Sequence, residues 1–264
     1  MPIIPNASLA KLRAGELSIG FGAHHLRTAA TPALAKAAGY DWLFIDMEHG
    51  AFSIQEATQL CLAALPVGIA PLVRVCTDAL DEGTRALDNG AQGIIVPHID
   101  TPELARRVAA AFRFPPEGHR SWGGPVASYG FLPPAHDVAQ QEINREVLVI
   151  GMIETEQALS NLDAIAATPG IDVLFIGTSD LTADMGLAGQ IGHDRVVAAY
   201  AAVIAACRKN GKYAGVGGVY DEVWAPKYVG MGARFILGGS DQQFLFGAAS
   251  ARARFLEGLQ HQLR

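Results

Sequence analysis

Charged and imidazole side chains stand at or directly after the ends of five short apolar segments of the sequence. The segments are residues 42–45, 72–75, 93–96, 149–153 and 173–176, and the side chains are Asp46, Glu48, His49, Arg74, His98, Glu154 and Asp180. Carboxylates bind divalent cations, imidazole transfers protons near neutral pH, and guanidinium binds carboxylate or enolate oxygens. If the segments are strands of one parallel barrel, these groups meet at one end and form a catalytic pocket.

Two of the carboxylates, Glu154 and Asp180, suit a hard divalent cation, which takes one or two carboxylates and completes its shell with water and substrate oxygens. The alternative is that both are helix N-caps. Arg74 would be an unpaired buried cation on the pocket floor unless it met an anion, and a carboxylate or enolate oxygen of a substrate meets that need. The turn at 177–179 would direct backbone N–H groups at the same anion.

His49 is the candidate general base, because the ordinary pKa of imidazole lies near physiological pH. Such a base needs an acid that orients its ring, and Asp46 and Asp88 are the candidates. Asp88 could also be no more than the last residue of a helix. An acidic residue there opposes the helix dipole, which favours another reason for its presence.

A lysine that could form an imine with the substrate is missing from the strand ends. The sequence has five lysines, which lie in predicted helices, in the N-terminal segment or before a strand: Lys11, Lys36, Lys209, Lys212 and Lys227. Lys212 precedes a strand and should face the opposite end of the barrel. Enolisation assisted by a metal is therefore favoured over the imine route.

Short β-type runs alternate with helical patterns along the chain, which is typical of a parallel α/β fold. The predicted strands are 18–21, 42–45, 72–75, 93–96, 147–153, 173–176, 213–216 and 235–237. The predicted helices are 32–38, 54–64, 79–89, 102–112, 157–167, 196–209, 220–230 and 242–259. Eight pairs in 264 residues predict one (β/α)8 TIM barrel over residues 1–264. An open doubly wound sheet is the alternative, but no glycine-rich dinucleotide motif follows the first strand.

One segment, residues 114–134, interrupts this rhythm and is rich in glycine, proline and aromatic residues. It is longer than an ordinary connection in an α/β fold. Because long ordered loops of a barrel usually belong to the active-site face, we expect it there.

The composition excludes several classes of protein. Hydrophobic residues make up 50% of the chain, which is too many for a disordered protein, and the net charge of −6 gives no footprint for nucleic acid or an anionic membrane. No secretory signal pattern and no apolar run long enough to span a membrane is present. Three widely separated cysteines argue against a disulfide framework. These features predict a cytoplasmic protein.

Several motifs follow one another at characteristic separations. They are FIDMEHG at 44–50, VRV at 73–75, GIIVP at 93–97, RFPPEGHR at 113–120, MIET at 152–155 and FIGTSDL at 175–181. With these motifs the chain resembles the HpcH/HpaI aldolase family, which comprises metal-dependent (class II) pyruvate aldolases of the phosphoenolpyruvate/pyruvate barrel superfamily. The resemblance covers nearly the whole chain.

The resemblance implies a role for each matching residue. Glu154 and Asp180 match the metal ligands, and Arg74 matches the arginine that stabilises the pyruvate enolate. His49 matches the catalytic histidine, whose acidic partner aligns with Asp88, and Asp46 matches another acidic active-site position. The backbone that contacts the pyruvate carboxylate corresponds to Gly177, Thr178 and Ser179. Relatives are often hexamers, and a trimer is the alternative; their exchange of a C-terminal helix between subunits would here involve residues 242–259.

The function implied is reversible cleavage of a 4-hydroxy-2-oxo acid to pyruvate or hydroxypyruvate plus an aldehyde, with Mg²⁺, Mn²⁺ or Co²⁺ as cofactor. The alternatives are a 2-oxo acid decarboxylase, a CoA-thioester lyase of the same superfamily, or a non-catalytic barrel that binds 2-oxo acids. CoA would need basic residues at the pocket mouth, for which Arg113, His119 and Arg120 form the obvious cluster.

Overall fold

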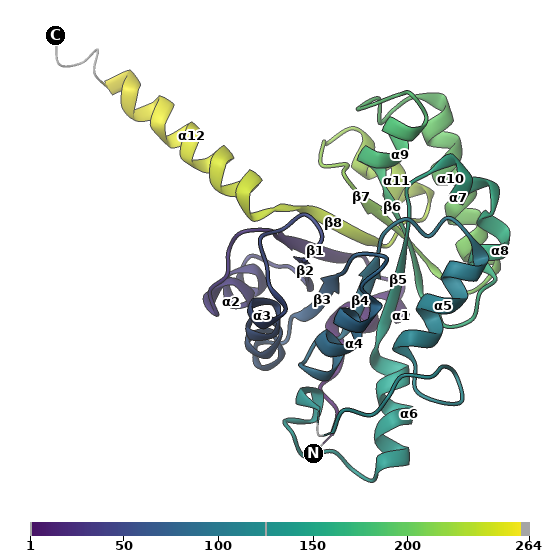
Figure 1. The fold of residues 1–264 in the computed structure, drawn as a ribbon. Helices are drawn as coiled ribbons and strands as arrows, with labels where there is room; N and C mark the ends of the chain where they lie inside the picture. The colour runs from purple at the N-terminus through teal and green to yellow at the C-terminus, as the bar shows by residue number, and fades with distance from the viewer. Residues whose placement is uncertain (1, 125, 260–264) are drawn as a thin grey trace.

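The computed structural model describes residues 2–124 and 126–259 and shows a closed barrel of eight parallel strands that pair in chain order (Figure 1). The strands are β1 (Ser18–Ala23), β2 (Trp42–Asp46), β3 (Ala70–Arg74), β4 (Gly93–Val96), β5 (Leu148–Ile153), β6 (Val173–Gly177), β7 (Tyr213–Gly217) and β8 (Phe235–Ser240). Most strands are buried along their whole length, because side chains point alternately into the barrel and toward the helices. The predicted TIM barrel is confirmed.

Helices surround the barrel, except for the first, which lies across one end, and the last, which projects away from it (Figure 1). They are α1 (Ala7–Arg13), α2 (Ala30–Ala37), α3 (Ile54–Val67), α4 (Leu80–Asp88), α5 (Pro102–Phe112), α6 (His136–Glu146), α7 (Glu156–Ser160), α8 (Leu162–Ala166), α9 (Thr178–Asp184), α10 (Asp194–Lys209), α11 (Trp224–Met231) and α12 (Asp241–Leu259). The sequence analysis missed α1, α6 and α9, and the helix expected at 157–167 is broken at Asn161 into α7 and α8.

Local sequence signals explain where the helices begin and end. Helix α3 starts with a capping box, in which the Ser53 hydroxyl accepts from the Glu56 N–H and the Glu56 carboxylate accepts from the Ser53 N–H. It ends at Gly68, whose φ of 71° lies in the left-handed region that glycine adopts without strain.

The inside of the barrel is filled by aromatic side chains. Trp42 stacks on Phe235 with a centroid distance of 4.0 Å, and Gly20 leaves the room that the indole needs, since a Cβ there would lie 2.3 Å from it. At the amino ends of the strands, Leu9 and Leu12 of α1 pack on this same cluster. Helix α1 therefore closes that end, so that the barrel opens at the carboxyl ends of its strands.

The segment at 114–134 does not lie where the sequence analysis placed it. It connects α5 with α6, and both precede β5, so it lies at the amino ends of the strands. There the Ile4 N–H donates to the Ser128 carbonyl and the Phe114 N–H donates to the Asn144 side chain. Within one chain, the described residues of this segment therefore do not lie on the active-site face. The expectation failed there because α6 was not recognised, and α6 decides on which side of the barrel the segment lies.

Helix α12 projects away from the barrel (Figure 1). Several of its large apolar side chains are exposed: Phe244, Leu245, Phe246, Phe255, Leu256 and Leu259. Exchange of this helix between subunits stays a prediction. Among the described residues, no helix is both long and apolar enough to cross a membrane.

Candidate active site

A pocket of about 340 Å³ opens at the carboxyl ends of the strands. Its lining includes seven of the residues that were expected there: His49, Arg74, Glu154, Gly177, Thr178, Ser179 and Asp180. Among the described lining residues, the expected Asp46, Glu48, Asp88 and His98 are missing. The pocket is completed by His24, Tyr220 and the apolar residues Phe44, Met152, Phe175 and Leu237. The predicted convergence of strand-end groups is therefore present, and Asp46 lies directly behind the lining.

Arg74 is held by two carboxylates rather than left unpaired. Its Nε and Nη2 donate to Asp46 at 2.9 and 2.6 Å, and its Nη1 lies 3.1 Å from Glu48. The pairing follows from strand register, since Asp46 and Arg74 are direct neighbours on β2 and β3. Burial alone would raise the pKa of Asp46, but the hydrogen bond and charge of Arg74 hold it below its usual value. The guanidinium is thus fixed in one orientation, with the Phe44 ring 4.9 Å from its carbon.

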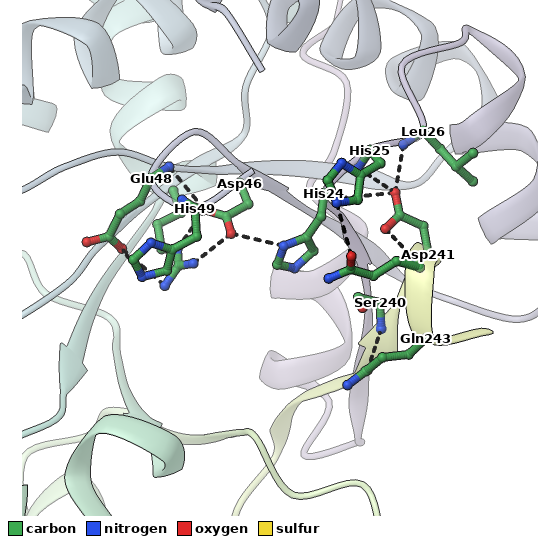
Figure 2. A network of polar contacts seen from close by, with 11 residues as sticks. His24, His25, Leu26, Asp46, Glu48, His49, Ser240, Asp241 and Gln243 are labelled. Carbon is green, nitrogen blue, oxygen red and sulfur yellow. Dashed lines mark hydrogen bonds and ion pairs between the residues drawn. The ribbon is translucent and has the colours of Figure 1, made fainter. Parts of the chain in front are cut away.

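Among the polar side chains that line the pocket, those of Tyr220 and His24 were not expected from the sequence. His24 is the more informative of the two. Its Nδ1 lies 3.2 Å from Asp46 Oδ2, so Asp46 lies between His24 and Arg74 (Figure 2). Burial lowers the pKa of His24 more than the charges of Asp46 and Asp241 raise it. Strand β1 was expected to end at Phe21 and in fact continues to Ala23. With β1 ending at Ala23, a search for polar residues directly after each strand would have found His24 too.

His49 lines the pocket, but neither candidate acid orients its ring. Asp46 accepts from the His49 backbone N–H, and the imidazole is 68% exposed with Glu48 4.0 Å from its Nε2. Asp88 is the last residue of α4, just before the amino end of β4, where it accepts from Arg120 at 2.7 Å. Within one chain, Asp88 and His49 therefore lie at opposite ends of the barrel.

Glu154 and Asp180 face the pocket from neighbouring strand ends, as a cation site requires. Glu154 is 1% exposed, and burial together with the charge of Asp180 raises its pKa against the opposing effect of His98. A divalent cation would relieve this unfavourable charge, so the donor set fits one. A Cβ at Gly177 would lie 2.3 Å from Glu154 Oε1, so any larger residue there would force the Glu154 carboxylate to shift.

Glu154 and Asp180 would be the ligands that the protein supplies to the cation. No cluster of three or more His, Cys, Asp or Glu side chains that could hold a metal is found in the described part of the chain. The remaining positions must then be filled by substrate oxygens and water, which is typical of Mg²⁺ and Mn²⁺ sites.

The turn after β6 supplies backbone donors at the pocket wall. The Thr178 side chain is buried and turned away, because its hydroxyl pairs with Tyr200 and the Gly217 carbonyl. Ser179, by contrast, is exposed at the pocket in the first turn of α9. The turn can therefore present N–H groups to an anion without a side chain in the way.

The lysine that imine formation would need and the arginines suggested for CoA binding do not belong to the described lining of this pocket. Among the described residues that line the pocket there is no lysine, and Lys212 donates to the carbonyls of Thr168 and Ile171 at the far end of the barrel. Arg113 and Arg120 are buried and paired with Asp172 and Asp88. The cluster suggested for CoA is thus absent from the pocket lining.

Comparison with known proteins agrees with this geometry. The family model described as HpcH/HpaI aldolase/citrate lyase matches residues 26–248. The chain belongs to this family. The predicted resemblance is thereby confirmed, and the chain is an enzyme of the aldolase and lyase class.

Members of the HpcH/HpaI family with curated names resemble it over most of its length. A 4-hydroxy-4-methyl-2-oxoglutarate aldolase of Hapsidospora irregularis is 38% identical over 89% of this chain and 88% of its own. A 2-keto-3-deoxy-L-rhamnonate aldolase of Salmonella schwarzengrund is 34% identical over 94% and 92%. The crystal structure of a family protein from Burkholderia cenocepacia superposes with a TM-score of 0.85 at 32% identity and covers 96% of this chain and 99% of that one.

Proposed function

We propose that this enzyme reversibly cleaves 4-hydroxy-2-oxo acids to pyruvate or hydroxypyruvate plus an aldehyde. The observation that carries the proposal is the placement of Glu154 and Asp180 in one pocket with the fixed guanidinium of Arg74, with no lysine among the described lining residues. The names of the two aldolase relatives, whose substrates are 2-oxo acids, support the same substrate class.

Glu154 and Asp180 would hold a divalent cation, with Mg²⁺, Mn²⁺ and Co²⁺ as the candidates. The cation would act as a Lewis acid toward the 2-oxo acid. Arg74 donates to the substrate oxygen on which negative charge develops, and the turn at 177–179 binds the carboxylate. The pairing with Asp46 and Glu48 keeps the guanidinium in place, so little reorganisation is needed as the charge appears.

His49 is the group that we propose moves the proton of the C4 hydroxyl, directly or through a water. Because Asp88 of the same chain lies at the opposite end of the barrel, we propose that Asp88 of a neighbouring subunit orients the His49 ring. The exposed apolar residues of α12 support a homo-oligomer, since burying them against a second copy removes them from water. A hexamer or trimer fits this arrangement.

The three free cysteines agree with a reducing compartment, and we propose a cytoplasmic location. Cys61 and Cys207 are buried, and burial raises the pKa of the Cys207 thiol to about 12. The exposed Cys76 also has a raised pKa, chiefly through desolvation, so it is a poor nucleophile.

Removal of divalent cations tests the proposal. Enzyme treated with EDTA should release no pyruvate from a 4-hydroxy-2-oxo acid, because the two carboxylates alone cannot stabilise developing negative charge. Activity should return on addition of Mn²⁺ or Mg²⁺ and should not return with K⁺ at the same ionic strength. Full activity in the metal-free enzyme would contradict the proposal.

A further inference from the structure

His24 lines the pocket, but the reaction proposed above assigns no role to it. It follows β1, and in a closed barrel of eight strands β1 lies opposite β5, at whose end Glu154 stands. A 2-oxo acid bound at the end of β5 and β6 would therefore extend across the pocket toward His24. The part of the substrate that reaches it is the part derived from the aldehyde.

The two nitrogens of the His24 ring differ in their surroundings. Nδ1 faces the Asp46 carboxylate at 3.2 Å, while Nε2 has no hydrogen-bond partner among the described residues. Since burial favours the neutral imidazole, the proton is best placed on Nδ1, toward the negative charge. Nε2 then carries a lone pair on the side of the ring away from Asp46 and can accept a hydrogen bond.

The position of His24 is fixed from three sides. Its backbone N–H donates to Asp241 Oδ2 at 3.0 Å, and the next two residues, His25 and Leu26, donate to the same oxygen (Figure 2). Its ring stacks on Phe44 with an interplanar angle of 20°, and its side chain is only 19% exposed. A group held in this way can recognise a ligand at little entropic cost.

Two imidazoles line the pocket, and that of His49, which follows β2, is the one proposed to move the proton of the C4 hydroxyl. The described strand residues that line the pocket on either side of His24 offer no acceptor. β2 contributes Phe44 and β8 contributes Leu237, and both side chains are apolar. A substrate hydroxyl that enters this side loses its hydrogen bonds to water and finds His24 as its acceptor.

We propose that His24 Nε2 accepts a hydrogen bond from a hydroxyl next to the aldehyde carbon, so that the enzyme favours α-hydroxyaldehydes over unsubstituted ones. This inference rests on the proposed function and names the acceptor class for it. His24 is thereby a specificity-determining residue that contacts the substrate.

The kinetic test uses two aldehydes that differ by one hydroxyl, glycolaldehyde and acetaldehyde, each with pyruvate and Mn²⁺. The wild type should favour glycolaldehyde in kcat/KM by about fivefold or more. His24→Asn keeps an amide near Asp46 but has no atom at the Nε2 position, and His24→Phe keeps the ring without either nitrogen. In both variants kcat/KM for glycolaldehyde should fall more than kcat/KM for acetaldehyde, so that the preference disappears. His25→Phe, at the exposed neighbouring histidine, is the matched control and should keep the preference.

A binding measurement separates this inference from the proposed function. The ligands are 5-hydroxy-2-oxopentanoate and 2-oxopentanoate, neither of which can be cleaved because both lack a hydroxyl on C4. With Mn²⁺ present, the wild type should bind the hydroxylated ligand about fivefold more tightly, and His24→Asn should bind both equally. Equal binding by the wild type, or an equal loss for both ligands in the variant, would overturn the inference. A wild type that discriminates between the ligands but cleaves no 4-hydroxy-2-oxo acid would overturn the proposed function alone.

Discussion

At the scale of single residues, the arrangement of the site depends on which partners the two carboxylate oxygens of Asp46 contact. Oδ1 accepts from Arg74 Nε and from the backbone of Glu48 and His49, while Oδ2 accepts from Arg74 Nη2 and faces His24. One buried carboxylate thus fixes a guanidinium, an imidazole and the loop that carries His49. Because such a group cannot be solvated when a partner is lost, changes at Arg74 should act strongly.

Arg74→Lys should lower kcat/KM by a factor of about 10² to 10³, since the lysine keeps the charge but its single nitrogen cannot reproduce the planar contact of Nε and Nη2 with Asp46 that orients the guanidinium. Steady-state kinetics of pyruvate release measure this loss. Arg106→Lys, in an exposed pair with Glu103, is the control and should change nothing. A loss below about tenfold for Arg74→Lys would mean that the paired donors of the guanidinium add little to the stabilisation that the positive charge alone provides.

Gly177→Ala should weaken Mn²⁺ binding by about tenfold or more, because the added Cβ occupies the space of the Glu154 carboxylate. Calorimetric titration with Mn²⁺ measures the effect without reference to activity. The matched control is Gly230→Ala in α11, where a Cβ would have no atom within 4 Å. Unchanged Mn²⁺ affinity in Gly177→Ala would remove Glu154 from the proposed ligands.

At the scale of elements, the junction of β8 and α12 is tied to the loop after β1. Asp241, the first residue of α12, accepts from the backbone N–H groups of three consecutive residues of that loop. Burial alone would raise the pKa of Asp241, but these bonds, with that from Gln242, outweigh it and lower the pKa. The element that projects from the barrel is therefore anchored beside the pocket.

Asp241→Asn should lower the free energy of unfolding at pH 7 by about 1.5 to 3 kcal/mol, because the N–H groups then face a neutral amide in place of a charged carboxylate. The folded-state pKa of Asp241 lies below its unfolded value, so its stabilisation is present above the unfolded pKa and is lost as pH falls through the folded one. Urea titrations of both proteins should therefore differ at pH 7 and converge toward pH 3. A constant difference across that range would contradict the role of the charge.

At the scale of the whole molecule, the two residues proposed as a catalytic pair, His49 and Asp88, lie at opposite ends of one barrel. The His49 ring lies at the carboxyl end of the barrel without an acid that orients it, and Asp88 lies at the amino end. An assembly that sets the amino end of one barrel against the carboxyl end of another would complete the pair. The exposed apolar side chains of α12 provide a surface for such an assembly.

Mixed assemblies of His49→Ala and Asp88→Asn chains should regain activity that neither variant has alone, because some sites then combine an intact His49 with an intact Asp88 from the neighbour. Random co-assembly predicts recovery of roughly a quarter of the wild-type activity. Light scattering of the wild type should give a multiple of 27.8 kDa. No recovery in verified mixed oligomers, or an active monomer, would contradict pairing across subunits.

The sequence by itself determined the barrel and the convergence of Glu154, Asp180 and Arg74 on one pocket, because strands buried on both faces consist of apolar runs and polar residues at their ends are conspicuous. Three outcomes depended on tertiary structure. The pairing of Arg74 with Asp46 depends on strand register, and the position of His24 in the pocket depends on two further residues of β1. The side of the barrel on which the loop at 114–134 lies depends on α6, which the sequence pattern did not predict. Periodicity shows which residues end a strand, but only packing decides which of them share a proton or a charge.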